Sequence, residues 1–136
     1  MKKHIIITLL TAFAITANAQ DLKNAMGNSI ASIKADGRIL NQMGNIIGFF
    51  KADGRVQNTM GNTIGFIKDE GRIQTAMSNT IGFFKADGTV QNEMGNTIGF
   101  IKEDGKVQNA MSNSIGSYAN IKRVYVACYF FFFSFK

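Results

Sequence analysis

The sequence contains no proline and no tryptophan, and it has a single cysteine and a single histidine. The lone cysteine, Cys128, excludes an intramolecular disulfide, so an apolar core must hold the fold together. The only histidine, His4, lies in an N-terminal segment that we expect to be removed. The remaining chain therefore offers no Ser-His-Asp triad, no Cys-His pair and no histidine metal ligand. We predict that the protein is not an enzyme, with no catalytic residues, no metal and no cofactor.

The first 19 residues have the composition of a secretory signal peptide. Two lysines precede an apolar run over 5–15, and Ala17-Asn18-Ala19 fits the small-x-small pattern for cleavage before Gln20. The alternative, an N-terminal membrane anchor, would need a longer apolar run. We therefore predict a signal peptide over 1–19, one repeat domain over 20–136, and an exported protein in the periplasm or outside the cell.

The charged residues do not predict a nucleic-acid partner. The formal net charge is +6, and removal of Lys2 and Lys3 with the signal leaves a mild, dispersed excess of positive charge. A nucleic-acid groove needs clustered basic residues with exposed aromatics. Most acidic residues lie in recurring Asp-Gly links, where one or two carboxylates are flanked by lysine or arginine. These carboxylates are better explained as turn formers than as ligands for calcium, which takes six to eight oxygens.

A 17-residue repeat organises the chain, typified by GRVQNTMGNTIGFIKDE over 54–70. Counting from Asp21 gives six full units and a partial seventh, in which Cys128 takes the position of a methionine. The period is kept by one methionine per unit: Met26, Met43, Met60, Met77, Met94 and Met111. Such regular repetition predicts an array of small supersecondary units, with atypical units at its ends.

Each repeat contains two short arms that we predict to be strands. In one unit these arms are Arg55–Met60 and Thr63–Lys68, rich in β-branched and aromatic residues and too often interrupted by glycine for a helix. Alternation along the first arm places Val56, Asn58 and Met60 on one face.

Two kinds of link join the arms. The x-Asp-Gly link is typical of a three-residue hairpin loop closed by a left-handed glycine. The Gly-Asn link predicts a two-residue turn. Serine replaces glycine there in two units, and we expect Asn79 and Asn113 to carry the positive φ in those turns.

A glycine also recurs inside the second arm of five repeats. An interior strand glycine marks either a bulge or a close approach of another part of the chain. Its regular recurrence favours close approach at a narrow place, such as a central axis. The glycines of this row are Gly48, Gly65, Gly82, Gly99 and Gly116.

The C-terminal segment, residues 123–136, is the most apolar part of the chain after the signal. We predict that it forms a long Phe-rich closing strand, buried on both faces. With the repeats, this predicts an all-β fold: a closed, pseudo-symmetric ring of 17-residue β-hairpin repeats. The alternative is a β-solenoid, in which Val56 would pair in parallel with Ile73, one repeat further on.

The combination of the 17-residue unit, the signal peptide and the Phe-rich end resembles the five-fold beta-flower family of small secreted bacterial proteins. The resemblance covers residues 20–136. It implies a compact, closed all-β arrangement with approximate five-fold symmetry and no established biochemical activity. No functional residues carry over from it.

Two rows of asparagines are the candidates for a ligand surface. They could form a polar ring that grips a glycan or a peptide, or they could cap turns, which is the role we favour. The candidates are Asn58, Asn92 and Asn109 in the first arm and Asn62 and Asn96 in the turn.

The function that we predict is a non-catalytic binding or structural role with an unknown ligand, either a glycan or an envelope protein. A membrane partner is not expected. The alternative is an envelope protein that self-assembles or associates with membranes through Phe130–Phe133.

Overall fold

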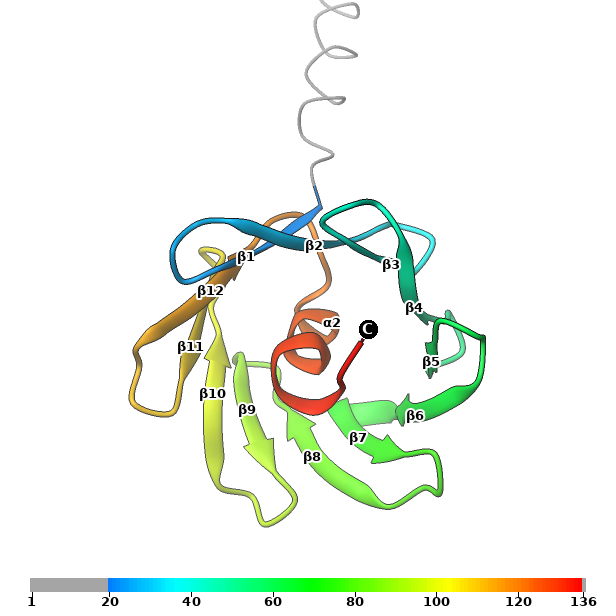
Figure 1. The fold of residues 1–136 in the computed structure, drawn as a ribbon. Coiled ribbons are helices and arrows are strands. Elements are labelled where there is room, and N and C mark those ends of the chain that lie inside the picture. Colours follow the sequence, from blue (N-terminus) through cyan, green and yellow to red (C-terminus); the bar gives the residue numbers. More distant parts are fainter. Residues whose placement is uncertain (1–19, 136) are drawn as a thin grey trace, which may run out of the picture.

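Twelve short strands surround a C-terminal helix in the structure, a computed structural model that describes residues 20–135 (Figure 1). The predicted signal peptide lies outside the described residues. Two helical elements, α2 (Arg123–Ala127) and the π-helix η2 (Cys128–Phe132), follow the last strand, and a short 3-10 helix, η1 (Asp69–Gly71), forms one turn. The strands are β1 (Asp21–Asn24), β2 (Ser29–Ile33), β3 (Arg38–Asn41), β4 (Ile46–Phe50), β5 (Arg55–Asn58), β6 (Thr63–Ile67), β7 (Arg72–Thr75), β8 (Thr80–Phe84), β9 (Thr89–Asn92), β10 (Thr97–Ile101), β11 (Lys106–Asn109) and β12 (Ser114–Tyr118).

The strands form a closed antiparallel barrel. Each strand pairs with its neighbours in sequence, and β1 pairs with β12, so the sheet has no free edge. Val56 in β5 lies opposite Phe50 of β4 and Gly65 of β6. These pairings confirm the predicted ring of β-hairpin repeats. They exclude the solenoid, which required Val56 to pair in parallel with Ile73.

Within the described residues the ring consists of six hairpins, one for each full 17-residue unit. The five-fold symmetry implied by the family resemblance is therefore not the symmetry of the strands. The predicted seventh unit is also wrong, because the chain leaves the sheet after Tyr118 and becomes helical at Arg123.

The two kinds of turn lie at opposite ends of the barrel. The Asp-Gly turns between repeats (35–37, 52–54, 69–71, 86–88 and 103–105) form what we call the charged end. The turns inside each repeat (25–27, 42–44, 59–61, 76–78, 93–95 and 110–112) form the methionine end, whose hairpins flare outward toward the viewer in Figure 1.

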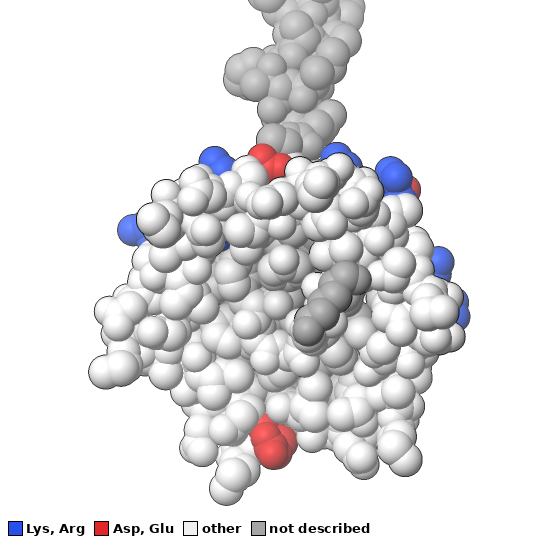
Figure 2. Space-filling view, viewed as in Figure 1, with Lys and Arg blue, Asp and Glu red and all other residues white. Residues whose placement is uncertain are grey.

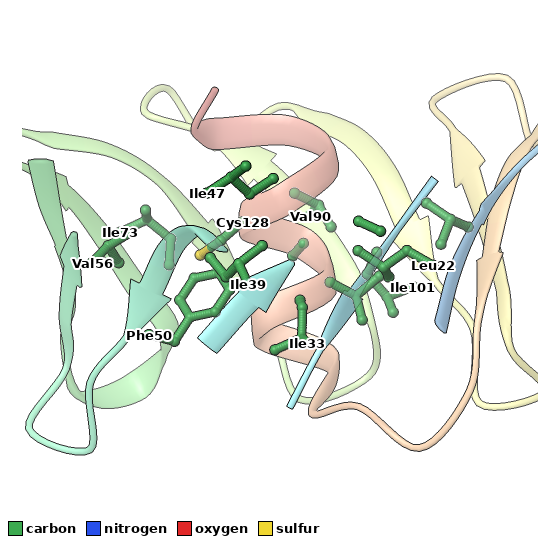
Figure 3. Packing of buried hydrophobic residues seen from close by; sticks show 14 residues of the cluster. Leu22, Ile33, Ile39, Ile47, Phe50, Val56, Ile73, Val90, Ile101 and Cys128 are labelled. Carbon is green, nitrogen blue, oxygen red and sulfur yellow. The ribbon is translucent and has the colours of Figure 1, made fainter. Parts of the chain in front are cut away.

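One side chain from the first strand of every hairpin points into the barrel and packs around the central helix (Figure 3). These residues recur every 17 positions and are fully buried: Leu22, Ile39, Val56, Ile73, Val90 and Val107. Val126, Ala127 and Cys128 of the helix meet them and are also fully buried. The repeat therefore supplies one ring of core residues, and the helix supplies its centre.

The prediction of a closing strand over 123–136 is wrong, because this segment forms α2 and η2 inside the barrel. The closed ring leaves no strand edge with which such a segment could pair. A helix satisfies its own backbone hydrogen bonds in an apolar interior, which a single unpaired strand cannot do. Barrels with more than about eight strands are too wide for side chains alone to fill, so a twelve-stranded ring needs a further segment inside it. We call this segment, residues 123–135, the plug.

The plug explains the interior glycines. Five phenylalanine rings rest on five of these glycines, and a Cβ atom at each glycine would collide with the ring and with a carbonyl of the adjacent strand. The pairs are Phe130 on Gly116, Phe131 on Gly99, Phe132 on Gly82, Phe133 on Gly65 and Phe135 on Gly48. In the first repeat Ala31 takes the place of the glycine. The predicted close approach is therefore confirmed, and the neighbour includes an aromatic ring.

The wide π-helix lets consecutive side chains reach consecutive repeats. Six repeats divide the ring into steps of about 60°, whereas an α-helix turns by about 100° per residue. In η2 the N–H of Phe133 donates to the carbonyl of Cys128 at 2.9 Å, an i to i+5 bond that widens the helix and reduces its turn per residue. The angle between successive side chains of the plug is thus closer to the angle between successive hairpins of the ring.

Candidate functional site

The methionine turns share one set of hydrogen bonds that fixes their shape. In β5 and β6 the side-chain oxygen Oδ1 of Asn58 accepts bonds from the backbone N–H groups of Met60 and Asn62, both at 3.0 Å. The N–H of Gly61 donates to the backbone carbonyl of Asn58, also at 3.0 Å. The asparagine thus holds a three-residue loop with the methionine at its apex.

The five predicted ligand-surface residues fall into two groups in the structure. Asn58, Asn92 and Asn109 are partly buried, and each uses Oδ1 to accept the same two turn N–H groups. Asn62 and Asn96 are exposed at the ends of the loops, and their backbone N–H groups donate to these Oδ1 atoms. The first group therefore has the turn-capping role that we favoured. For Asn62 and Asn96 the ligand-surface role stays a prediction.

The predicted two-residue Gly-Asn turn is wrong in detail. The backbone hydrogen bonds enclose a loop of three residues. The third residue of the loop has the positive φ angle, and it is glycine in most repeats. Where serine replaces this glycine, Ser78 and Ser112 themselves carry positive φ angles of 70° and 69°. Asn79 and Asn113, which we expected to take this role, do not. The loop has three residues where two were predicted, so the residue with positive φ lies one position earlier in the sequence than Asn79 or Asn113.

Six methionine side chains stand exposed at the apexes of these turns. Between 79% and 85% of each is accessible to solvent, and the six are Met26, Met43, Met60, Met77, Met94 and Met111. The sequence-based prediction put Met60 on one strand face with Val56, but β5 ends at Asn58 and Met60 belongs to the loop. An exposed large apolar side chain in every repeat is unusual enough to require an explanation.

The plug forms the apolar centre of this end. Phe130, Phe131, Phe132, Phe133 and Phe135 are half-buried and pack against the core. Beside the plug, a hollow of about 520 Å³ opens between Phe135 and the turn that carries Met60. The methionine end is thus a ring of thioether side chains around a partly exposed aromatic centre.

This end of the molecule carries almost no charge. Figure 2, viewed toward the methionine end, shows mostly uncharged surface, with basic groups confined to the outline. Glu93 is the one charged residue in the six methionine turns, all of which lie within the described chain. In contrast, the Asp-Gly turns and the strand ends beside them hold most lysines and arginines.

The pockets at the charged end lie between the Asp-Gly turns and residues 121–125. The first, of about 500 Å³, is lined by Ile67, Phe84, Val124 and two lysines. The ammonium groups of these lysines, Lys68 and Lys85, lie 5.5 and 5.7 Å from phenylalanine rings of their own strands. They are thus engaged in cation–π contacts. Glu70 is the third charged residue that lines this pocket.

The Asp-Gly turns use their carboxylates locally. Asp53 Oδ1 accepts the backbone N–H of Arg55 at 3.2 Å, and Oδ2 accepts the Arg55 Nε–H at 2.9 Å. The backbone hydrogen bond is the main cause that lowers the pKa of Asp53, and the side-chain bond and charge of Arg55 add to it. Such a carboxylate stays ionised and engaged with its own turn, which suits turn formation better than acid–base catalysis.

Cys128 has no features of a nucleophile. It is fully buried in the plug, and this burial raises the pKa of its thiol far above the usual value. The reactive form of cysteine is the thiolate, which this environment suppresses. Nowhere in residues 20–135 do three or more His, Cys, Asp or Glu residues gather in a way that could hold a metal ion.

A sequence model of the family described as 5-fold beta-flower protein matches residues 19–134, most of the chain. The chain belongs to this family. The description of this beta-flower family concerns its fold and gives neither a ligand nor an activity. No curated protein and no solved structure showed significant similarity to the chain. None of the helices that the structure describes in this beta-flower protein is long and apolar enough to span a bilayer.

The exposed methionines are the residues that sequence reasoning missed. A signal for them was present, because each methionine stands directly before the glycine or serine of a turn that is bounded by polar residues, as in Asn58-Thr-Met-Gly-Asn62. A methionine in such a turn cannot continue the strand and point into the core. In this beta-flower protein, the alternation assumed for the strand therefore ends before the methionine.

Proposed function

We propose that the protein is an exported, non-catalytic binding protein that contacts its partner through the methionine end. One observation carries the proposal: every hairpin presents an exposed methionine at the same place, 79–85% accessible to solvent. Exposed apolar side chains that gather on one face of a protein mark interaction surfaces. Methionine suits this purpose because it is flexible and adapts to irregular partners.

The chemistry of the described side chains supports a binding role. The recurring carboxylates are engaged in turns, and the one cysteine is buried in a protonated state. Among the residues of the barrel and plug, no buried side-chain nitrogen or oxygen lacks a hydrogen-bond partner. The interior is therefore built for stability, and surface chemistry remains as the means of function.

Export is supported by the composition of residues 1–19, with its basic start, apolar run and Ala-x-Ala end. The test is N-terminal sequencing of the protein recovered from cell fractions and culture medium. A chain that begins at Gln20 in the periplasm or the medium is the expected result. Full-length protein in the cytoplasm would contradict export, without bearing on the methionine end.

The binding role is tested by thermal unfolding of the purified protein against a panel of glycans, peptidoglycan fragments, apolar peptides, divalent cations and lipids. A ligand at about 100 times its Kd raises the free energy of unfolding by about 2.7 kcal/mol. The matched control replaces all six turn methionines by glutamine, which has a similar length and is polar. We expect at least one panel member to stabilise the native protein and not the glutamine variant.

Two results would overturn the proposal. One is a panel in which nothing binds, or in which every ligand stabilises the glutamine variant as much as the native protein. The other is turnover of a generic ester, glycoside or peptide substrate that an aspartate-to-asparagine variant in the Asp-Gly turns abolishes.

A further inference from the structure

We propose that the methionine end docks on a lipid surface, where its six apexes enter the boundary between headgroups and acyl chains. The inference rests on the proposed function and names the partner. From the sequence, membrane association is only the alternative prediction and is assigned to Phe130–Phe133, whereas the exposed methionines place it at the turns. Charge, hydrogen bonding and shape at this end each point to lipid.

The six apexes occupy equivalent positions on the ring. The six turns have nearly equal exposure at their methionines and belong to one pseudo-symmetric closed ring. Five of the six use the same asparagine cap, and the sixth uses Thr75 in its place. Equivalent turns on a symmetric ring end at a similar level around the axis. A flat surface therefore meets all of them together, whereas a protein partner would have to repeat the same chemistry six times.

The methionine turns satisfy most of their own backbone donors. The N–H groups of Met60, Gly61 and Asn62 all donate to Asn58, through its side-chain oxygen or its backbone carbonyl. Moving an N–H group out of water is costly unless it is already hydrogen-bonded. The asparagine cap thus prepares the apex to enter a less polar environment, and it does so in the repeats that carry asparagine at this position.

The methionine end carries almost no charge. The methionine turns contain one acidic residue, Glu93, and no lysine or arginine. Proteins that bind membranes through electrostatic attraction use basic clusters, and they require anionic lipid and low salt. Docking through the methionine end instead depends on apolar burial, so a neutral lipid should suffice and added salt should have little effect.

The shape of this end favours lipid over a second copy of the chain. The six exposed methionines stand around an aromatic centre that is only half-buried, and a hollow of about 520 Å³ opens between Phe135 and the turn that carries Met60. Two such rings placed face to face would meet at their rims and enclose unfilled space, whereas stable protein interfaces pack as densely as protein interiors. Acyl chains and headgroups are fluid and can fill the space between the apexes, including the hollow beside Met60.

The test is flotation of the full protein with phosphatidylcholine vesicles, at low and at high salt. We expect the native protein to float at both. Substitution of all six methionines by glutamine (M26Q, M43Q, M60Q, M77Q, M94Q and M111Q) should weaken binding roughly tenfold or more, because polar amides replace the inserted thioethers. Substitution by leucine should preserve binding. A control at the other end (K51Q, K68Q, K85Q and K102Q) should float like the native protein.

Circular dichroism melts of each variant must first show that the barrel is intact, which we expect because the methionines are exposed. Absence of flotation would overturn the inference. So would binding that needs phosphatidylglycerol and is lost in high salt or in the lysine variant, because the charged end would then be the contact. A methionine-dependent dimer in light scattering, without flotation, would assign the surface to a second copy.

The experiment also separates this inference from the function on which it rests. Methionine-dependent binding of a peptide or glycan without flotation overturns the lipid assignment and leaves the binding role standing. Binding of every ligand and of vesicles by the glutamine variant as well as by the native protein overturns both.

Discussion

The charged end and the methionine end are both built from three-residue turns, yet these turns pack in opposite ways. At the charged end, the carbonyl of Gly54 accepts a hydrogen bond from the backbone N–H of Ile67, the last residue of β6, at 2.7 Å. A Cβ on Gly54 would lie 2.5 Å from the carbonyl oxygen of Ile67. At the methionine end, nothing lies within 4 Å of the corresponding position on Gly61. One turn is pressed against the barrel, and the other stands free of it.

This difference explains the pattern of substitution within the chain. The pressed glycine is kept in every Asp-Gly turn, at 37, 54, 71, 88 and 105. The free glycine is replaced by serine in two of the six methionine turns, and at the four glycines that remain nothing lies within 4 Å of an added Cβ. The charged end therefore locks successive repeats to one another. The methionine end is released from packing, and its side chains are available for contact with a partner.

The plug joins these two ends. Near its start, the guanidinium of Arg123 donates to the carbonyls of Ala86 and Ile101 at the charged end, at 3.1 and 3.2 Å. At its far end, Phe135 rests on Gly48 beside the hollow of the methionine end. Polar bonds thus fix one end of the plug, and aromatic packing holds the other.

The largest expected effect comes from placing the same substitution at the two kinds of turn. Gly54→Ala and Gly61→Ala both put a side chain at positive φ, which costs about 1–2 kcal/mol. Only Gly54→Ala also forces Cβ into a carbonyl, and overpacking of this kind adds about 1–3 kcal/mol. Urea unfolding should show a clearly larger loss for Gly54→Ala. Equal losses would mean that the charged end is no more tightly packed than the methionine end.

Much of the barrel could be predicted from the sequence because its determinants are local and repeated. The β-branched arms act within one hairpin, the Asp-Gly turns join one hairpin to the next, and the six copies of the 17-residue unit confirm one another. The row of interior glycines also pointed to a crowded axis, although it did not say what crowds it. The ring is the structure in which every copy has the same neighbours.

The plug could not be predicted in this way, because its conformation depends on the whole ring. VYVACYFFFFSF has the composition of a buried strand, and a free sheet edge would have suited it. Closure of β1 on β12 removes that edge, and the segment satisfies its backbone by forming a helix. Tertiary context here overrides local propensity. The methionine surface was missed for a smaller reason, a loop one residue longer than predicted.

A second comparison concerns the side chains that hold the turns. Asn58→Ala removes the acceptor of two backbone N–H groups at the methionine end and should cost about 1–2 kcal/mol. Asn58→Thr should recover part of this, because Thr75 in the equivalent position accepts one such bond, from Asn79 at 3.2 Å. Asp53→Ala at the charged end should cost less, because that carboxylate is exposed. Unfolding midpoints that rank Asp53→Ala as the most damaging would contradict this account.

A third, smaller effect is confined to the charged end and depends on pH. Backbone N–H groups two residues ahead lower the pKa values of Asp36, Asp53 and Asp87 below the ordinary 3.8. A carboxyl whose pKa is lowered by folding stabilises the protein at pH values above its unfolded pKa, and this contribution is lost as the pH falls through the folded value.

We therefore expect a modest fall in the urea midpoint as the pH drops from about 5 to about 2. The triple variant D36N, D53N and D87N keeps acceptors for these N–H groups but cannot titrate. It should show a shallower fall, and an unchanged pH dependence would show that other groups are responsible.

The smallest expected effect on stability is that of oxidising the methionines. Mild peroxide should convert the six exposed thioethers to sulfoxides, which are polar, while leaving buried Cys128 protected. Because the side chains contact little of the barrel, the free energy of unfolding should change by less than about 0.5 kcal/mol. Mass spectrometry would count the added oxygens, urea unfolding would report stability, and vesicle flotation would report binding. Loss of flotation at unchanged stability is the expected outcome. A large loss of stability would instead mean that the methionine side chains support the fold.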